Sequence, residues 1–323
     1  MKKYFIYTLL VAFVATFSFT SCKDDGNGGE EAVAYETLTT YLKSVDMDLN
    51  KVLTNANGDK FVMAAPADGD VTGKWVMDIR NATDYNAAHI EGAHNVAFTD
   101  ILTAAATADK PILVVCYTGQ TACYATSLLR LYGYEDAQAL KWGMSGWNAQ
   151  FDKWTPNCKD LTDDNNWTNA QFAPGSFDDP VINSSTADGA TLLQERVEAV
   201  VAAGFKTATG NEVLSNPSGY YINNYFSADH YSNFGHIDGA TRVSPLLIEN
   251  FSSLDPASKV VTYCYTGQTS AVITAYLRVC GFDAYSLTFG INGMTHSNPY
   301  WDAGGVSNHW GHDSNPKDLP TVN

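Results

Sequence analysis

Two short segments of the sequence place a cysteine where it could act as a nucleophile. The hexapeptide CYTGQT occurs twice, beginning at Cys116 and again at Cys264. Each copy follows an apolar run rich in β-branched residues and leads into a segment with apolar residues at helical spacing, which puts the cysteine between a strand and the start of a helix. The hexapeptide itself contains no acid, base or second metal ligand. The backbone of the loop can nevertheless stabilise a negative sulfur without a separate base.

The start of a helix can supply that stabilisation. Its first N–H groups have no partner within the helix and together carry roughly half a positive charge, and a thiol beside them has its pKa lowered from about 8.5 towards the thiolate. Gly119 and Gly267 let the backbone bend so that several N–H groups face one centre. Thr121 and Thr269 add hydroxyl groups that can donate to an anion or cap the helix. We expect each loop to hold an anionic sulfur without a basic side chain.

Three kinds of reaction use a cysteine in this position, and the neighbouring residues separate them. A cysteine-dependent phosphatase grips phosphate with an arginine six residues after the nucleophile, but Ala122 and Ser270 occupy these positions. A thiol–disulfide oxidoreductase carries a C-x-x-C motif, which the sequence lacks. In sulfur transfer the thiolate takes a sulfur atom from a donor, holds it as a persulfide and passes it to an acceptor by a ping-pong route. The pattern favours sulfur transfer.

The elements that must position the two cysteines also occur twice. The segment HIEGAHNV at 89–96 is matched by HIDGATRV at 236–243, and WGMSG at 142–146 is matched by FGING at 289–293. Two domain-sized copies in the same order indicate a tandem duplication. In each copy buried strands alternate with helices, so the expected fold class is α/β, with a mostly parallel sheet flanked by helices in each domain. The expected boundaries are 36–158 for the first domain, 159–189 for a polar linker and 190–323 for the second domain.

These motifs together resemble the tandem-domain rhodaneses, a family of sulfurtransferases. The family's loop has the form C-x-x-G-x-T followed by Ala or Ser, and its D-x-R strand appears here as Asp78-Ile79-Arg80, followed by the H-I-x-G-A segment at 89–93. The resemblance implies that Cys116 and Cys264 are catalytic, and that Asp78 and Arg80 support the first loop from below. The substrate-binding residues that it implies are Tyr117, Thr118, Gly119, Gln120 and Thr121 in the first loop and Tyr265, Thr266, Gly267, Gln268 and Thr269 in the second.

The resemblance also implies a reaction and its partners. The donor would be a small sulfur compound of the thiosulfate or mercaptopyruvate class, the acceptor cyanide, a small thiol or a protein thiol, and neither a cofactor nor a metal is expected. The second copy has Tyr-Ile-Asn-Asn-Tyr at 221–225 where D-x-R is expected, and neither loop has the cation that thiosulfate users often carry there. These departures leave open an alternative, a non-catalytic rhodanese-fold module that binds or senses its partners at the cell envelope.

The charge of the chain and its first residues bear on its location. Acidic residues outnumber basic ones 35 to 19, which gives a net charge of −16, and no cluster of Lys and Arg offers a surface for nucleic acid. A basic start and an apolar run that is short for a spanning helix predict a signal peptide over 1–21. The end of this run resembles the lipobox of a bacterial lipoprotein. We therefore expect a lipid on Cys22 as the sole membrane attachment, a flexible tether over 22–35, and a periplasmic or surface-exposed location at the cell envelope.

The remaining cysteines give weaker signals. Five cysteines remain after Cys22, an odd number that leaves at least one thiol free. Cys123 and Cys280 have no cysteine counterpart in the other copy, and we expect them to pack inside helices. A resolving role for Cys123, seven residues after Cys116, is the alternative. Cys158 lies directly before the polar linker and is left unassigned.

The histidines do not form a recognisable site in the sequence. His89 and His236 are each followed by Ile-x-Gly-Ala, and we expect them to be hydrogen-bonded turn residues, not bases. His309 and His312 near the C-terminus show no metal-ligand spacing with a cysteine. No metal site is therefore predicted.

Overall fold

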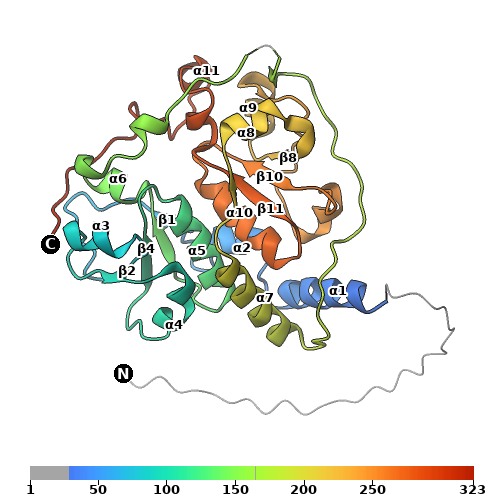
Figure 1. Cartoon of the computed structure of the whole chain (residues 1–323), viewed down its shortest axis with the longest axis horizontal. Helices are drawn as coiled ribbons and strands as arrows, with labels where there is room; N and C mark the ends of the chain where they lie inside the picture. The colour runs from blue at the N-terminus through green and yellow to red at the C-terminus, as the bar shows by residue number, and fades with distance from the viewer. Residues whose placement is uncertain (1–28, 164) are drawn as a thin grey trace.

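A computed structural model describes residues 29–163 and 165–323, and it has the α/β fold class that the sequence predicts (Figure 1). Two parallel sheets, each flanked by helices, lie side by side. The predicted signal peptide and Cys22 lie outside the described residues. Among the helices of the described part, none has both the length and the apolar character needed to cross a bilayer.

The first domain is built on a five-stranded parallel sheet with the order β1-β5-β4-β2-β3. All four residues of the central strand β4 are buried, as expected for a parallel strand that is covered on both faces. The strands are β1 Val62–Met63, β2 Trp75–Asp78, β3 His94–Asn95, β4 Ile112–Val115 and β5 Gln138–Leu140. The helices of this domain are α3 Ala82–Ala87, α4 Ile101–Ala105, α5 Gln120–Leu131 and α6 Gly143–Trp147.

The second domain repeats this plan with a four-stranded parallel sheet, in the order β7-β11-β10-β8. Its central strand β10 is again buried at all four positions. The strands are β7 Thr207–Ala208, β8 Tyr221–Asn224, β10 Val260–Tyr263 and β11 Ala284–Leu287, and a separate antiparallel pair joins β6 Trp167–Thr168 to β9 His236–Ile237. The helices are α7 Gly189–Ala203, α8 Gly210–Ser215, α9 Ala228–Asn233, α10 Gln268–Val279 and α11 Tyr300–Ala303.

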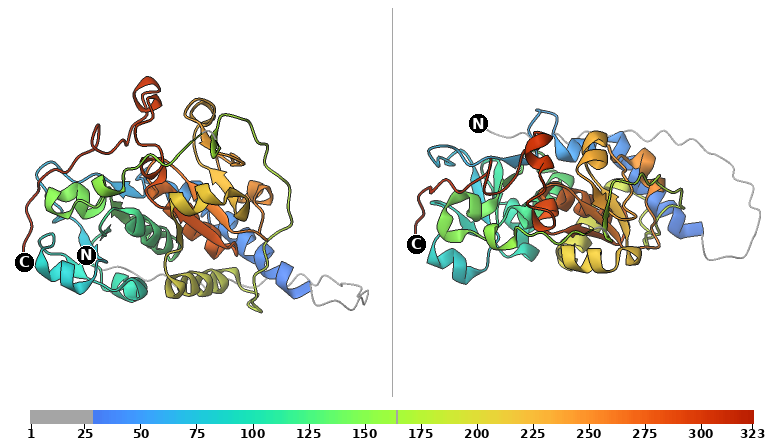
Figure 2. Two further views of the ribbon diagram at one scale, coloured as in Figure 1. Left: turned by 45° about the horizontal axis from the view of Figure 1, so that its top comes forward. Right: turned by 90° about the horizontal axis from the view of Figure 1, so that it is seen from above.

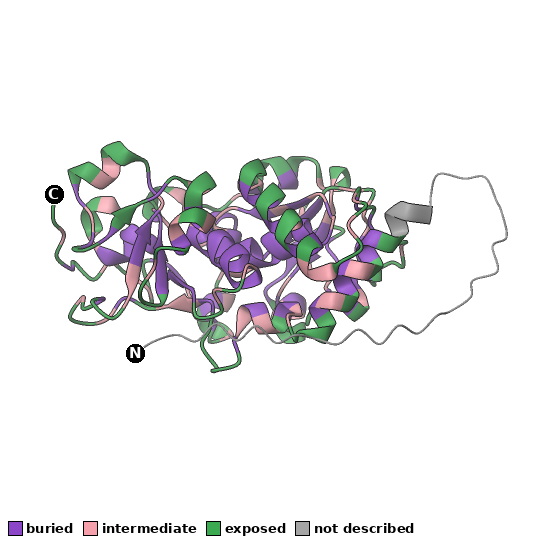
Figure 3. Ribbon diagram, turned by 90° about the horizontal axis from the view of Figure 1, so that it is seen from below, coloured by how far each residue is buried: buried purple, intermediate pink, exposed green. Residues whose placement is uncertain are grey.

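The two domains share one apolar core, centred on the packing of α5 against α10. Leu128 and Leu129 of α5 belong to the same buried cluster as Val272 and Ile273 of α10. The Ser127 hydroxyl donates to the Val272 carbonyl oxygen across the interface at 3.1 Å. In Figure 3 the buried residues run without a break from one sheet to the other. Because α5 and α10 each begin at a CYTGQT loop, this packing brings the two loops together.

The N-terminal part of the described chain is more ordered than the sequence suggests. Helix α1 spans Gly29–Ser44 and packs along α7 of the second domain. Tyr35 and Leu38 on this helix are buried in the shared core. The flexible tether that was expected over 22–35 is therefore wrong for its last seven positions, 29–35, which are helical. An apolar helix face buried against a neighbour stabilises a helix more than its own propensity does.

The polar linker and the C-terminal segment also depart from the expected boundaries. The linker lies on the second domain, where the N–H of Leu161 donates to the Met294 carbonyl oxygen at 2.6 Å. The C-terminal segment returns to the first domain, beside α3 and α6 (Figures 1 and 2). There the N–H of Leu319 donates to the Trp147 carbonyl oxygen at 2.9 Å, and Leu319 joins the core of the first domain. The last residues of the chain thus pack with the first domain, although they follow the second in sequence.

Candidate active site

The first CYTGQT loop, residues 116–121, bends its backbone around the sulfur of Cys116. Strand β4 ends directly before the cysteine, and Gly119 has a left-handed φ of +84° before α5 begins. The N–H groups of Gly119 and Ala122 donate to the Cys116 Sγ at 3.2 and 3.3 Å. Cys116 is only 3% exposed. The loop thus directs amide donors at a sulfur that is largely sealed from solvent.

The second loop, residues 264–269, holds Cys264 in a related way. Gly267 has a φ of +73° and precedes α10. The N–H of Ser270 donates to the Cys264 Sγ at 3.4 Å, and the Ser270 hydroxyl lies 3.7 Å from the same sulfur. That hydroxyl also shares a hydrogen bond of 2.8 Å with the Ser286 hydroxyl. The second sulfur is therefore contacted by a positioned hydroxyl in addition to a backbone amide.

Burial is the main influence on the pKa of the Cys116 thiol. Removal from water raises the pKa of Cys116, and this effect outweighs the backbone N–H groups of Ala122, Thr118 and Gly119, which lower it; the Asp78 carboxylate raises it further. The expectation of a lowered pKa is therefore wrong for this residue in the described conformation. The amides do favour the anion, but desolvation acts more strongly against it.

Each loop rests on a tight turn that admits only glycine. A Cβ atom on Gly143 would lie 2.4 Å from the Cys116 carbonyl oxygen, and a Cβ atom on Gly290 would lie 2.2 Å from the Cys264 carbonyl oxygen. Both glycines also have left-handed φ angles, of +58° and +54°. These are the first glycines of the repeated WGMSG and FGING segments. Each repeated segment therefore packs directly against the backbone of its loop and forms the floor of that loop.

Asp78 and Arg80 form a buried ion pair beside the first loop. The Arg80 Nη2 lies 2.7 Å from the Asp78 Oδ2, and both side chains are 0% exposed. The same nitrogen donates to the Ala88 carbonyl oxygen at 2.9 Å. The guanidinium carbon of Arg80 lies 5.9 Å from the centroid of the Tyr117 ring. The pair therefore contacts the loop through Tyr117, as a cation over an aromatic face.

The second domain replaces this ion pair with neutral groups. Asn224 has the register position of the aspartate, since each is paired with the residue directly before its loop cysteine. Its side chain donates to the Tyr263 hydroxyl at 2.9 Å and accepts from the N–H of Phe226 at 3.0 Å. The Phe226 ring stacks on the Tyr265 ring at 4.6 Å, where the first domain uses a guanidinium. The second domain therefore lacks the buried ion pair. Its loop tyrosine, Tyr265, is still covered, by the Phe226 ring.

The two loops face each other across the domain interface and exchange glutamine contacts. The Gln268 Nε2 of the second loop donates to the Thr118 carbonyl oxygen of the first loop at 3.1 Å. In return the Gln120 Oε1 accepts from the N–H of Phe289 at 2.8 Å. Both glutamines were expected to bind substrate, but in the described conformation these side-chain atoms join the domains. Gln268 still lines the pocket at the second loop.

That pocket has a volume of about 450 Å³ and is lined by residues of both domains. Its cationic groups are Lys60 and Lys141 of the first domain. Burial lowers the pKa of Lys141, with Asp313 acting in the opposite direction and the like charge of Lys60 lowering it further. From the second domain it is lined by Tyr265, Thr266, Gln268, Thr269 and Asn308. Sequence reasoning missed the two lysines because they lie in the other domain and far from Cys264 in the chain.

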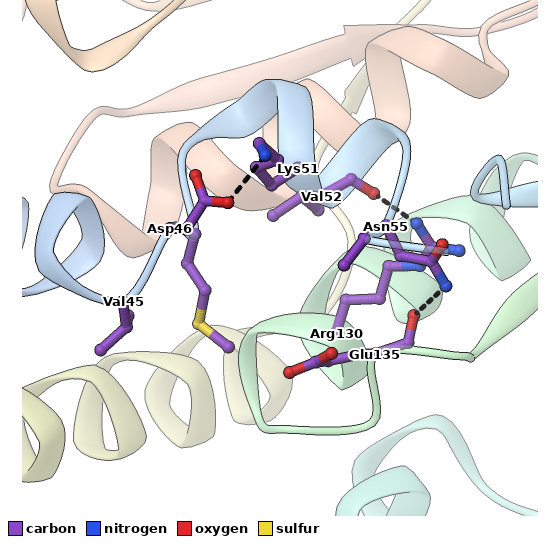
Figure 4. A pocket seen from close by; sticks show the side chains of 9 residues that line it. Val45, Asp46, Lys51, Val52, Asn55, Arg130 and Glu135 are labelled. Atoms are coloured by element: carbon purple, nitrogen blue, oxygen red, sulfur yellow. Dashed lines mark hydrogen bonds and ion pairs between the residues drawn. The ribbon is translucent and has the colours of Figure 1, made fainter. Parts of the chain in front are cut away.

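Arg130 at the end of α5 holds the chain segment that carries Lys60. Its guanidinium donates to the Val52 carbonyl oxygen at 3.0 Å and to the Lys60 carbonyl oxygen at 3.2 Å. Arg130 also lines a separate pocket of about 170 Å³ beside α2, Leu49–Leu53 (Figure 4). Burial lowers the pKa of Arg130 to about 10. Its donors are occupied by backbone oxygens, so we assign this arginine to structure and not to a ligand.

The other cysteines of the described chain are free thiols. Cys123 and Cys280 are 0% exposed, inside α5 and at the end of α10, and burial raises the pKa of both. Cys158 is partly exposed, and burial raises its pKa to about 12. The loop cysteines are free as well, so neither sulfur is tied up in a disulfide.

His89 and His236 are hydrogen-bonded to the backbone near the sheet edges. The His89 Nδ1 lies 3.0 Å from the Tyr85 carbonyl oxygen, and the His236 Nδ1 lies 2.6 Å from the Thr168 carbonyl oxygen. Burial lowers the pKa of His236 to about 4. These hydrogen bonds to the backbone agree with the expectation, but neither residue lies in a turn: His236 begins strand β9, and His89 forms an isolated bridge with Val322.

Comparison with known proteins adds an independent observation. The model of the rhodanese-like domain matches residues 62–150 and 226–297. The thiosulfate sulfurtransferase GlpE of Shewanella oneidensis is 33% identical over 75 residues, which are 23% of this chain and 74% of that protein. GlpE of Pseudomonas fluorescens SBW25 is 35% identical over 82 residues, 24% of this chain and 74% of that protein. A solved thiosulfate sulfurtransferase of Pseudomonas aeruginosa aligns with 84% of this chain and 49% of that one, at 16% identity and a TM-score of 0.28.

Proposed function

Because the chain belongs to the family of rhodanese-like domains and carries two of them, we propose that it is a sulfurtransferase that carries sulfane sulfur as a cysteine persulfide. The main support is that backbone N–H groups donate to each loop sulfur: two lie 3.2 and 3.3 Å from the Cys116 Sγ, and one lies 3.4 Å from the Cys264 Sγ. Preorganised N–H groups stabilise a negative sulfur without the reorganisation that water would need. Neither loop needs a basic side chain for this.

The reaction has two steps that share the cysteine sulfur. In the first, the thiolate attacks the outer sulfur of a donor such as thiosulfate, the S–S bond of the donor breaks, and its electron pair leaves on sulfite. In the second, cyanide or a thiolate takes the outer sulfur of the persulfide, and the electron pair of that S–S bond returns to the cysteine. The acceptor thiol belongs to a small molecule or to a protein. The loop amides favour the anionic form of the sulfur in the free cysteine and in the persulfide, although burial opposes ionisation of the Cys116 thiol.

The pocket over the second loop supports an anionic donor at Cys264. The neutral loops and the negative charge of the chain disfavour a dianion, but two lysines of the first domain line this pocket. Lys60 and Lys141 are close enough for one charge to lower the pKa of the other. A bound anion would relieve that repulsion and interact with both groups at once. We therefore propose that Cys264 accepts sulfur from anionic donors more readily than Cys116 does.

The direct test is the intact mass of the full chain after incubation with thiosulfate or mercaptopyruvate. We expect a gain of one sulfur atom on a loop cysteine and its loss on addition of cyanide, with thiocyanate as the product. A chain that gains no sulfur from either donor would support the alternative of a non-catalytic binding module.

The two pocket lysines should control the apparent affinity for the donor. Lys60→Gln and Lys141→Gln are each expected to raise KM for thiosulfate about tenfold with little change in kcat, because each removes binding to the donor and leaves the sulfur cradle intact. Lys43→Gln, an exposed position on α1, is the matched control and should leave KM unchanged. Steady-state kinetics at several salt concentrations would measure this. A KM that stays within twofold in the double variant would exclude the pocket as the entry of the donor.

We also propose that the mature chain is anchored at the cell envelope by a lipid on Cys22. The support is the sequence of the first 22 residues, with its basic start, apolar run and Thr-Ser-Cys ending. Labelling of cells with a radioactive fatty acid should mark the wild-type protein and fail to mark Cys22→Ala. Equal labelling of both would rule out this anchor.

A further inference from the structure

Three histidines from two segments of the second domain gather at one place. His296 follows the short helix η6, Gly290–Gly293, whereas His309 and His312 lie in the irregular segment that follows α11. One ring nitrogen of each histidine lies within 4.8 Å of the others. The ring centroids of His309 and His312 are 3.9 Å apart, and those of His296 and His309 are 4.4 Å apart.

The hydrogen bonds of this cluster leave nitrogen lone pairs available. The His309 Nε2 lies 2.9 Å from the His296 carbonyl oxygen, and since a carbonyl oxygen only accepts, this nitrogen carries the proton and the Nδ1 of His309 does not. A metal-binding histidine is usually oriented in this way, by donating its second N–H to a carbonyl or carboxylate oxygen. The Nδ1 of His296 is buried and has no hydrogen-bond partner. Such an atom is costly to bury unless something satisfies it.

Hydrogen bonds and ring stacking hold His296 and His309 in place without a ligand. The Asp313 carboxylate accepts from the N–H groups of Asn308 and His309, both at 2.7 Å. His309 is 5% exposed and stacks on the Trp301 ring at 4.5 Å with an angle of 4° between the planes. On the other side the N–H of His296 donates to a linker carbonyl oxygen, that of Lys159, at 3.1 Å. These segments are therefore already ordered, and a ligand could bind without further ordering of the chain.

We propose that His296, His309 and His312 bind a divalent transition metal ion of the Zn²⁺ type. Neutral imidazole suits Zn²⁺, Cu²⁺ and Ni²⁺ and discriminates against Mg²⁺ and Ca²⁺, which prefer oxygen. Zn–N bonds of about 2.0–2.1 Å in a tetrahedral site place the nitrogens about 3.3 Å apart. The three nitrogens lie within 4.8 Å of one another, so each pair would have to close by at most about 1.5 Å to reach that spacing, and the exposed His312 has room to move. Three protein ligands leave a fourth position for a solvent molecule.

The site is connected to the second loop through Asn292. The Asn292 Nδ2 donates both to the Tyr265 carbonyl oxygen at 2.8 Å and to the Asn308 carbonyl oxygen at 3.0 Å, and its Oδ1 accepts from the N–H of Trp310 at 3.0 Å. Asn308 also lines the pocket over the second loop. A bound ion would therefore lie on the segment that forms one wall of that pocket.

Titration of the full chain with Co²⁺, followed by Zn²⁺, tests the proposal. We expect one equivalent of Co²⁺ to bind with the visible absorption of a site of low coordination number, and Zn²⁺ to displace it. His312→Gln and His309→Gln should each weaken binding at least about tenfold, by analogy with the 10–100-fold cost of losing even an indirect partner of a metal ligand. The exposed His94 stacks on Trp75 in the first domain, and His94→Gln is the matched control that should bind as the wild type does.

Two results would overturn the assignment. The first is a chain that binds neither ion with a defined stoichiometry. The second is binding that persists unchanged in both His309→Gln and His312→Gln, above all with the intense near-ultraviolet band of a thiolate ligand, which would place the ion at a cysteine. Because the His312 side chain is exposed, its replacement should not impair folding, and loss of binding in that variant can be attributed to the lost ligand.

Discussion

Cys264→Ser is expected to lower sulfur transfer from thiosulfate to cyanide by at least about 10³-fold, because it removes the atom that carries the sulfur between the two steps. Cys116→Ser should retain most of this activity. Both sulfurs are buried, at 3% and 2% exposed, but only the second loop lines a pocket with two lysines. The pKa of Cys116 is raised by burial and by the Asp78 carboxylate, whereas the neutral Asn224 has the position of that carboxylate in the second domain. Steady-state production of thiocyanate and the intact mass after thiosulfate would measure it.

Cys280→Ser is the matched control for this experiment. It removes a thiol from the same domain at a position that is 0% exposed at the end of α10, and it should leave sulfur loading unchanged. Equal losses in Cys116→Ser and Cys264→Ser would mean that the two loops act together. Full activity in Cys264→Ser would contradict the preference for the second loop and shift the proposal to Cys116.

The local features of the site could be predicted from sequence because they depend on neighbouring residues. A cysteine at the end of a β-branched run, a glycine three residues later and a helical pattern after it require a strand, a left-handed turn and a helix in that order. The structure has these elements, with Gly119 and Gly267 at positive φ. The repeated WGMSG and FGING segments pointed to a shared role, and the structure shows that role to be the floor of each loop.

The features that depend on how the domains pack could not be predicted. Lys60 and Lys141 line the pocket of the second loop although no motif links them to it. Gln120 and Gln268 look like substrate ligands in the hexapeptide, but their side chains bond to the opposite domain. The raised pKa of Cys116 has the same origin, since desolvation depends on what covers the loop. A single sequence carries no direct signal for such contacts between distant segments.

The interface also explains how two similar loops can differ in function. Helices α5 and α10 pack through one shared apolar core, so each loop lies against the other domain and each receives different neighbours from it. The second loop lies beside the lysines of the first domain, and the first loop accepts a hydrogen bond from Gln268 of the second domain, whose Nε2 donates to the Thr118 carbonyl oxygen at 3.1 Å. A duplicated hexapeptide thus occupies two chemically distinct environments. Sequence identity of the loops does not imply equal activity.

Gly290→Ala should disable the second loop without removing any reactive group. The new Cβ atom would lie 2.2 Å from the Cys264 carbonyl oxygen and 2.7 Å from the Thr266 nitrogen, both backbone atoms that cannot move without reshaping the loop. We expect a loss of about 3 kcal/mol in the free energy of unfolding, from overpacking and a left-handed φ together. Sulfur loading of Cys264 should fall about 100-fold, because a shift of about 1 Å at a catalytic centre has an effect of that size. Urea unfolding and intact mass after thiosulfate measure the two effects.

Gly239→Ala separates the steric effect from the backbone strain. Gly239 also has a left-handed φ, of +76°, but a Cβ atom there would meet no atom within 4 Å. Its replacement should cost only about 1 kcal/mol and leave sulfur loading intact, so the difference between the two variants reports the collision with the loop. Equal loading in both variants would show that the second loop tolerates a displaced backbone. The geometry of the amides around Cys264 would then not be what sustains transfer, and the proposal for that half of the chain would fail.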